Sequence, residues 1–477
     1  MSVLTITTNY HSYILPLPGT FSTIETAMDV AYPGDTIVLE PGYSSETVTI
    51  TQNDITISGT SASLDIELLI ADGVSGLILV GDAPINVTDS GASDILTGNE
   101  GDNTITVTGG TDFVDGGAGV DRLVVDYSSS TGTVSATTAT FAGSSGTVEI
   151  VAGSIENFTV LTGNSIDTIT LTTAHGNNYV NTGDGASTVV VGDGDNVFVG
   201  GGGIDTLTAG NGENTIDAGY GSIGANTITV GSGNNTILGG DGIDTISAGG
   251  GDNTIEAGDG ANTIAIGPTF SGANVIIAGN GIDIITTGNG DNYIDAGVGT
   301  IGANTITVGP TGFGTNTILG GDGIDTITVG KGDNNIEAGN GANTITAGPT
   351  GVGNNRIIAG DGIDTITTGN GDNCIDAGSV GANTIAAGSG NNVIVAGSGI
   401  DTITVGNGDN YIAAGDGANT VTAGFGDNFV TIGDAIDTIT AMGGNNVIEA
   451  GTVGVNTVTT GGGNDVVETG SAADVIV

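Results

Sequence analysis

The 477-residue sequence contains no tryptophan, and aromatic residues make up only 4% of it. A conventional hydrophobic core in a chain of this length would need more large apolar side chains, so the composition argues against one compact globular core. No run of 18 apolar residues occurs, and we therefore expect no membrane-spanning helix. The first 13 residues hold neither a basic segment nor an apolar one, so we expect no Sec signal peptide.

Basic residues are also scarce. Only Arg122, Lys331 and Arg356 are basic, against 53 acidic residues, which gives a formal net charge of −50. This balance argues against nucleic acid and anionic membranes as partners, and it favours divalent cations. The alternative is an acidic surface that only keeps the protein soluble, as in halophilic proteins.

Cysteine and histidine are nearly absent. The single cysteine, Cys374, excludes an internal disulfide framework and thiolate zinc clusters, and its place in the sequence pattern predicts an outward side chain. His11 and His175 are the only imidazoles, and the sequence has no Ser-His-Asp set, no HExxH and no phosphate-binding loop. We therefore predict that the protein is not an enzyme. The alternative is an enzyme that acts on polysaccharides.

Glycine is abundant, with 91 copies, and most of them belong to a nine-residue repeat that runs from about residue 161 to the end. The units GDGIDTISA (240–248) and GGGDNTIEA (249–257) show the pattern: a glycine-rich loop, then a short strand centred on one aliphatic residue. The aspartate of the phrase GIDT recurs at spacings of 36 to 42 residues. The larger unit is therefore four nonapeptides plus short insertions such as 267–274, which is typical of a solenoid.

Two nonapeptides make one turn of the solenoid that we predict. Because side chains alternate across a strand, the central aliphatic residues should point inward. They include Ile246, Ile255, Ile264, Ile276, Ile285 and Ile294. The predicted fold is all-β: a right-handed parallel β-solenoid (β-helix or β-roll) with a short N-terminal capping helix.

The phrase Gly240-Asp-Gly242-Ile-Asp244-Thr-Ile246 matches the pattern G-x-G-x-D-x-U-x, and equivalents cover more than half of the chain. The pattern resembles the RTX (repeats-in-toxin, hemolysin-type) calcium-binding nonapeptide. The resemblance implies that loops of successive turns clasp Ca²⁺ through the aspartate carboxylate and loop carbonyl oxygens. The residues that it implies as ligands are Asp94, Asp121, Asp167, Asp205, Asp244, Asp283, Asp325, Asp364, Asp401 and Asp437.

The sequence departs from that family because only one nonapeptide in four keeps aspartate at the ligand position. The others carry asparagine, as at Asn214, Asn226, Asn235, Asn253, Asn262 and Asn274. Aspartate and asparagine should alternate along one side of the solenoid, and the other side should be nearly all asparagine. Since neutral amides can form a hydrogen-bonded ladder without metal, we predict a calcium column on one side and an asparagine ladder on the other. The alternative is that these aspartates and asparagines are only turn residues and bind no ion.

The sequence suggests three segments: an N-terminal cap with irregular coils (1–95), imperfect repeats with a hairpin-like excursion (96–160), and the regular repeat (161–477). A capping box at Ser22–Glu25 precedes a helical pattern that reaches Ala31. The short strands expected after it resemble the entry cap of pectate-lyase-like β-helices. The last four residues, Asp-Val-Ile-Val, resemble the export signal of type I secretion substrates, which implies a secreted or cell-surface protein.

The two outward faces should differ. One carries stacked Thr-x-Thr pairs, such as Thr326 with Thr328, and resembles the threonine array of β-solenoid antifreeze proteins; the β-sheet preference of threonine is the simpler explanation. The other alternates acidic and apolar residues: Asp217, Leu238, Glu256, Ile277, Asp295, Leu319, Glu337, Ile358, Asp376 and Val395. Apolar stripes mark contact surfaces. We predict a secreted calcium-binding structural protein that self-assembles into a layer, fibre or matrix or serves as an adhesin; an ice- or polysaccharide-binding module is the alternative.

Overall fold

The computed structural model of the protein describes residues 3–6, 20–74, 76–172, 175–219, 221–267, 272–297 and 301–477. His11 and residues 268–271 of the predicted insertion lie outside this set. The chain divides into two compact units, Met1–Val230 and Gly231–Val477. Each unit is a parallel β-solenoid, and together they contain about 23 turns, as predicted for the fold class. In the described ranges, no helix is long and apolar enough to cross a membrane.

In the first unit the strands alternate between two sheets. The first sheet contains β1 (Val3–Ile6), β2 (Thr20–Phe21), β3 (Thr36–Leu39), β5 (Ile55–Gly59), β7 (Leu77–Gly81), β9 (Ile95–Thr97), β11 (Gly110–Asp115), β13 (Ser135–Thr137), β14 (Thr140–Gly143), β15 (Gly146–Ile150), β17 (Thr168–Leu171), β19 (Thr188–Val191), β21 (Thr206–Ala209) and β23 (Thr227–Val230). The second sheet contains β4 (Ser44–Ile50), β6 (Leu64–Ile70), β8 (Ile85–Thr88), β10 (Thr104–Val107), β12 (Arg122–Asp126), β16 (Asn157–Leu161), β18 (Tyr179–Asn181), β20 (Val197–Val199) and β22 (Thr215–Asp217).

The second unit repeats this arrangement. Its first-sheet strands are β25 (Thr245–Ala248), β27 (Thr263–Ile266), β29 (Ile284–Thr287), β32 (Thr305–Phe313), β35 (Thr326–Lys331), β37 (Thr344–Val352), β39 (Thr365–Asn370), β41 (Thr384–Ala387), β43 (Thr402–Val405), β45 (Thr420–Ala423), β47 (Thr438–Ala441), β49 (Thr457–Thr460) and β51 (Val475–Ile476). Its second-sheet strands are β24 (Thr236–Leu238), β26 (Thr254–Glu256), β28 (Val275–Ile277), β30 (Tyr293–Asp295), β33 (Thr317–Leu319), β36 (Asn335–Glu337), β38 (Arg356–Ile358), β40 (Cys374–Asp376), β42 (Val393–Val395), β44 (Tyr411–Gly415), β46 (Phe429–Ile432), β48 (Val447–Glu449) and β50 (Val466–Glu468). Loop strands β31 (Ile301–Gly302) and β34 (Asp322–Gly323) pair with each other.

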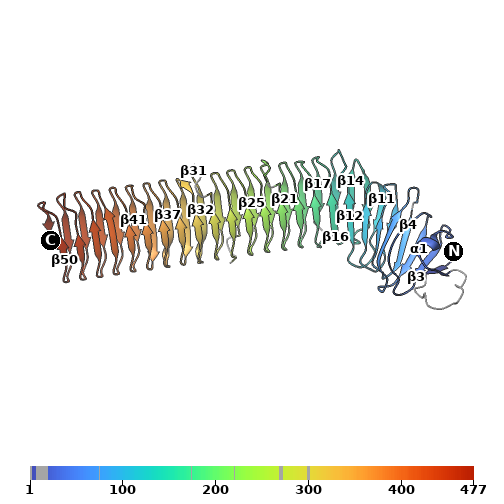
Figure 1. Cartoon of the computed structure of the whole chain (residues 1–477), viewed down its shortest axis with the longest axis horizontal. Helices are drawn as coiled ribbons and strands as arrows, with labels where there is room; N and C mark the ends of the chain where they lie inside the picture. Colours follow the sequence, from blue (N-terminus) through green and yellow to red (C-terminus); the bar gives the residue numbers. More distant parts are fainter. Residues whose placement is uncertain are drawn as a thin grey trace. The chain divides into compact units, whose positions relative to one another are not determined.

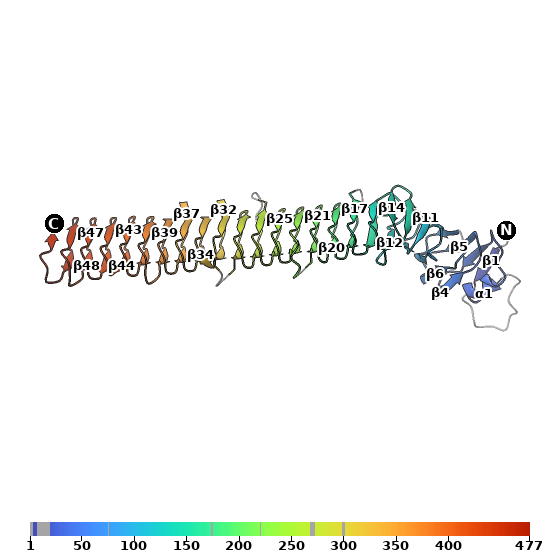
Figure 2. The ribbon, with the colours of Figure 1, turned by 90° about the horizontal axis from the view of Figure 1, so that it is seen from above.

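The register of the pairing confirms the turn of two nonapeptides. Thr245 pairs with Thr263 and Thr326 pairs with Thr344, in each case 18 residues apart in the chain and in parallel. Within the second unit, successive strands of one sheet stack on each other in order (Figure 1). First-sheet strands such as β39 and β43 lie along one side, and second-sheet strands such as β44 and β48 lie along the other (Figure 2).

The core of each turn is built from aliphatic side chains that point inward from both sheets. The predicted inward residues Ile246, Ile255, Ile264, Ile276, Ile285 and Ile294 are all buried, with at most 1% of their surface exposed. Full burial of such a side chain contributes roughly 1.5–3 kcal/mol. The predicted outward position of Cys374 is also confirmed, because its side chain is exposed.

The N-terminal helix differs from the prediction. Helix α1 covers Ile24–Met28, and its N-cap is Thr23 rather than Ser22. The capping box is formed by Thr23 and Thr26: each side-chain oxygen accepts the backbone N–H of the other residue. The helix ends at Met28, three residues before the end of the predicted pattern, so Val30 is half exposed at 50%.

The segment between β12 and β16 interrupts the regular turns. Strand β14 pairs antiparallel with both β13 and β15. Strand β15 pairs in parallel with β11, and β13 pairs in parallel with β17, so this antiparallel insertion remains part of the first sheet. Its core includes Phe141, which stacks on Phe158 with 5.9 Å between the ring centroids.

Glycine is required where one loop lies directly on the next. Gly260 has φ +143°, and a Cβ atom at this position would lie 1.4 Å from the carbonyl oxygen of Gly242. We expect Gly260→Ala to lower the free energy of unfolding of the second unit by at least about 2 kcal/mol, because both the φ value and the contact are unfavourable. Gly462 is the matched control, because a Cβ atom added there would meet no other atom within 4 Å. Equal denaturant midpoints for the two alanine variants would contradict this interpretation.

Candidate metal centre

The residues immediately before the first-sheet strands form a column in which aspartate and asparagine alternate, as predicted. In the second unit the backbone N–H of Asn304 donates to Asp325 Oδ1 (2.7 Å), and that of Asp325 donates to Asn343 Oδ1 (2.9 Å). The N–H of Asn343 donates in turn to Asp364 Oδ1 (2.8 Å). One oxygen of each side chain therefore connects its turn to the preceding one. We call this set of positions the Asp/Asn column.

The side-chain amide nitrogen of an asparagine in the column typically donates to main-chain carbonyl oxygens, although Asn456 Nδ2 has no hydrogen-bond partner. Asn343 Nδ2 donates to the carbonyl oxygens of Gly339 and Ala359, each at 3.0 Å. Asn262 Nδ2 donates in the same way to Gly258 and Ala278, again at 3.0 Å. The amide group therefore bridges carbonyl oxygens of two successive turns.

The aspartates place a carboxylate oxygen where the asparagines place an amide. The Oδ2 atom is buried and has no hydrogen-bond partner in Asp205, Asp283, Asp325, Asp364, Asp401 and Asp437. A Cβ atom at Gly320 would lie 3.0 Å from Asp325 Oδ2 and 3.1 Å from the carbonyl oxygen of Ala338. Glycine thus leaves room beside oxygens that repel each other unless a cation or a proton lies between them.

The pKa values of these carboxyl groups reflect that environment. Burial raises the pKa of Asp283 to about 7, and the N–H donated by Asn262 offsets part of the rise. Burial likewise raises the pKa of Asp205, Asp325 and Asp364 to about 6. The pKa of Asp401 is raised for the same reason. A bound cation would stabilise the charged form in each case.

The opposite side of the solenoid carries the predicted asparagine ladder. In the second unit, Asn334 Nδ2 donates to Asn355 Oδ1 (2.8 Å), and Asn355 Nδ2 donates to Asn373 Oδ1 (2.9 Å). Asn373 Nδ2 also donates to the carbonyl oxygen of Gly371 (2.9 Å). This side satisfies its polar groups without a cation, which explains why the sequence can dispense with aspartate there.

The predicted ligands do not share one environment. Asp244 belongs to the Asp/Asn column: its backbone N–H donates to Asn262 Oδ1 (2.9 Å). Asp167 accepts from Val134 N (2.7 Å) and from Thr162 Oγ1 (2.6 Å), so both of its oxygens are hydrogen-bonded. Asp121 precedes a second-sheet strand, on the side opposite the column, where its Oδ1 accepts from Asn103 N (2.7 Å).

Two further aspartates were not among the predicted ligands: Asp474 directly precedes β51 in the column, and Asp112, within β11, lies opposite the predicted ligand Asp94. Asp474 Oδ1 accepts from Asn456 N (2.7 Å), and Asp112 Oδ1 accepts from Asp94 N (2.9 Å). Each leaves its Oδ2 without a partner. The phrases that end at these residues, GSAAD and GGTD, match the repeat pattern G-x-G-x-D only in part, which is why the sequence did not single them out. Asp89, which also has an unpartnered buried oxygen, follows no repeat signal.

The donor set fits calcium. At Asp325 the unpartnered atom is a carboxylate oxygen, and the main-chain carbonyl oxygen of Ala338 borders the same space beside Gly320. Calcium prefers six to eight oxygen ligands in a tolerant geometry, whereas zinc and copper prefer nitrogen and sulfur. Calcium would add binding energy to the folded state and remove the need for protons on the buried carboxyl groups.

A comparison with family profiles supports the same ion. The profile described as RTX calcium-binding nonapeptide repeat (4 copies) matches residues 89–123, 190–219, 220–242, 238–265, 269–300, 311–348, 349–379, 378–406, 395–430, 431–452 and 450–477. These matches cover more than half of the chain and are calcium-binding motifs. No curated protein matches the sequence. The chain is a β-solenoid member of the RTX family of calcium-binding nonapeptide-repeat proteins.

Proposed function

We propose that this protein is a secreted, non-catalytic structural protein that calcium stabilises outside the cell and that then associates with further copies of itself. Proteins with RTX repeats are typically secreted through the type I route, which supports an extracellular location. Calcium is scarce in the cytosol and abundant outside. A chain that gains stability from calcium would therefore remain loosely folded for export and become rigid afterwards.

One observation carries the proposal of self-association: the regular outer face of the second sheet. In the second unit, Leu238 pairs with Glu256 and Glu256 pairs with Ile277. Ile277 then pairs with Asp295, and the alternation continues to Val395. Ile277 and Val395 are each 40% exposed. A periodic row of apolar and acidic side chains suits a partner with the same period, which a second copy provides.

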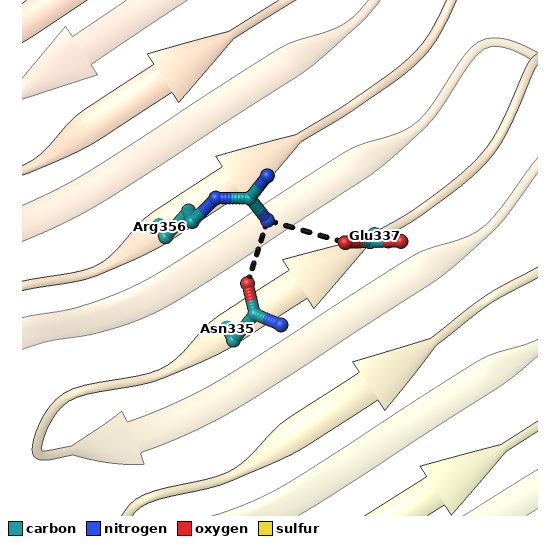
Figure 3. A network of polar contacts seen from close by, with 3 residues as sticks. All are labelled: Asn335, Glu337 and Arg356. Carbon is teal, nitrogen blue, oxygen red and sulfur yellow. Dashed lines mark hydrogen bonds and ion pairs between the residues drawn. The ribbon is translucent and has the colours of Figure 1, made fainter.

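A basic residue lies next to this row, because Arg356 pairs with Asn335 in the neighbouring row of the same sheet. The Arg356 guanidinium bonds Glu337 Oε1 at 3.1 Å and Asn335 Oδ1 at 2.9 Å (Figure 3). Both side chains of the ion pair are about half exposed, at 52% and 46%, so the pair contributes little to stability. It does neutralise one acidic position of the face, which would lower the repulsion between two copies there.

Electron microscopy of the purified protein with millimolar calcium tests the proposal. We expect sheets or filaments in calcium and dispersed particles in EDTA. Ile277→Asp combined with Ile358→Asp should abolish the assemblies, because both changes add charge to the apolar positions of the second sheet. Thr328→Asp adds a charge to the first sheet and is the matched control. Monodisperse particles at high calcium, or assemblies that survive the double variant, would contradict self-association through this face.

A binding function of the threonine face is the second candidate. Thr326 pairs with Thr344, and Thr344 pairs with Thr365, so these exposed threonines lie in register on successive first-sheet strands. A flat, regular array of hydroxyl and methyl groups suits ice or a polysaccharide. Thr326→Tyr with Thr344→Tyr should then abolish thermal hysteresis or glycan retention, and monomers that lack both activities would exclude this candidate.

A further inference from the structure

A row of exposed isoleucines runs along one edge of the solenoid in the second unit. Each of them directly precedes an aspartate of the Asp/Asn column, and between 58% and 66% of its surface is exposed. The row lies on the edge at which β31 is labelled in Figure 1. Its members are Ile243, Ile282, Ile324, Ile363, Ile400 and Ile436. A regular row of exposed apolar side chains indicates a contact surface.

Alanine replaces isoleucine on the turns in between. Each of these alanines is exposed and directly precedes an asparagine of the column: Ala261, Ala303, Ala342, Ala382 and Ala418. The strands that follow pair in register, as Thr326 does with Thr344, so large and small side chains alternate from turn to turn. Successive isoleucines are therefore about 9.6 Å apart, which is two strand spacings, and each alanine leaves a recess between them. We call the two sets together the isoleucine edge.

A row of polar residues runs beside the isoleucine edge in the same loops. Aspartates occupy many of its positions, such as Asp361, whose Oδ1 accepts the backbone N–H of Ser379 on the next turn (2.7 Å). Ser379 and Ser398 occupy the next two turns, so this part of the row carries no charge. Val380, which is 54% exposed, pairs with Ser398 and adds apolar surface. Over these two turns the edge is therefore apolar and has no acidic neighbour in the row.

We propose that the isoleucine edge is an interface between two copies of this chain, in which isoleucines of one copy fit into the alanine recesses of the other. Two such edges are complementary when they are offset by one turn, and their common period maintains the fit along the second unit. The uncharged turns at Ser379 and Ser398 let two chains of net charge −50 approach there with the least repulsion.

The area of the edge suffices for a dimer. The six isoleucines expose on the order of 600 Å² on each copy, so covering them in a pair removes about 1,200 Å² from solvent. Specific interfaces bury about 1,200–2,000 Å² in total. Since the contact uses the same edge of both copies, it closes as a dimer.

The isoleucine edge is separate from the second-sheet face that carries the proposed function, and neither contact depends on the other. Residues of the edge lie in loops before first-sheet strands, whereas the face is formed by second-sheet strands. Contacts on an edge and on a face extend an assembly in two directions. Together they would build a layer, while the edge alone gives a dimer.

Sedimentation velocity in millimolar calcium tests the edge in a variant whose second-sheet face is blocked, Ile277→Asp with Ile358→Asp. We expect this face-blocked variant to form dimers. Adding Ile363→Ala and Ile400→Ala should weaken dimerisation at least about tenfold, because apolar surface is lost from both copies. The fold should be retained, since alanine occupies the same position on alternate turns. Val352→Ala is the matched control, because Val352 is 68% exposed but lies at the other end of a first-sheet strand.

Filling a recess distinguishes a specific fit from general apolar association. Ala382→Ile adds apolar surface, yet it should also weaken the dimer, because the new side chain would meet an isoleucine of the other copy. Dimers that are strengthened by Ala382→Ile, or that survive the loss of Ile363 and Ile400, would overturn the proposal.

A further measurement needs no variant of the edge. Raising the salt concentration should strengthen the dimer of the face-blocked variant, because salt screens the repulsion between the aspartates beside the edge. Dimers that salt dissociates would contradict an apolar interface.

The two proposed contacts fail in different ways. Monomers of the face-blocked variant at every concentration would overturn the edge contact, and the edge would then suit a different protein. Wild-type chains that form dimers but neither sheets nor filaments would contradict association through the second-sheet face and support the edge.

Discussion

Chelation of calcium at pH 7.5 is expected to lower the melting temperature of the protein by more than about 20 °C. Each ion bound at one hundred times its dissociation constant adds about 2.7 kcal/mol to the folded state. The aspartates with an unpartnered Oδ2 recur on every second turn of the column, so several such increments act on one solenoid. Without the ion, the Oδ2 atom of each of these carboxylates is buried and has no hydrogen-bond partner.

The measurement is a thermal melt followed by circular dichroism in EDTA and in millimolar calcium, with magnesium as the control ion. Magnesium is smaller, demands octahedral geometry and retains its water, so it should restore little of the loss. Equal melting temperatures in EDTA and in calcium would exclude calcium as a stabiliser of the repeats.

In EDTA the protein is expected to become less stable as the pH rises from 5 to 8. The folded-state pKa of Asp283 is about 7, and that of Asp205, Asp325 and Asp364 is about 6, against a usual value of 3.8. Because these folded-state values are raised, the folded chain holds protons that the unfolded chain has released. Their contribution is complete below pH 4 and is lost as the pH passes through 6 to 7.

Calcium should reverse this dependence, because protons compete with the ion for the same oxygens. The comparison is the denaturant midpoint at pH 5 and at pH 8, in EDTA and in calcium. Hydrogen bonds lower the pKa of Asp259 and Asp434. Both carboxyl groups are fully exposed, so solvent screens their charge and they should change the pH dependence of stability little. A midpoint in EDTA that rises between pH 5 and pH 8 would contradict the assignment of buried, unpartnered carboxylates.

The sequence was sufficient to predict the regular part of the structure because each nonapeptide repeats the same local choices. One inward aliphatic residue, as at Ile246, and a loop glycine, as at Gly260, define the turn. The residue directly before each strand is aspartate or asparagine, and this choice determines whether that side of the solenoid buries a carboxylate or an amide. The alternation of Asp325 and Asn343 was therefore visible before the structure.

Contacts between distant residues were beyond the reach of the sequence. The Glu46 carboxylate of β4 accepts hydrogen bonds from the backbone N–H groups of Ile24 (2.9 Å) and Glu25 (3.2 Å). A side chain about 20 residues away in the sequence therefore helps to cap the N-terminus of α1. The hydrogen bonds that satisfy Asp167 come partly from the antiparallel insertion, which interrupts the repeat before it.

The most direct test of the account exchanges the two residue types of the column at neighbouring turns. In EDTA at pH 7.5, Asp325→Asn should stabilise the protein by on the order of 2 kcal/mol, because the new amide can donate where the carboxylate could not. Asn343→Asp should destabilise it in EDTA and recover in calcium. The measurement is the unfolding free energy of both variants and the wild type with and without calcium. If Asp325→Asn lowers stability equally in EDTA and in calcium, the carboxylate has a structural role of its own and the calcium column is wrong.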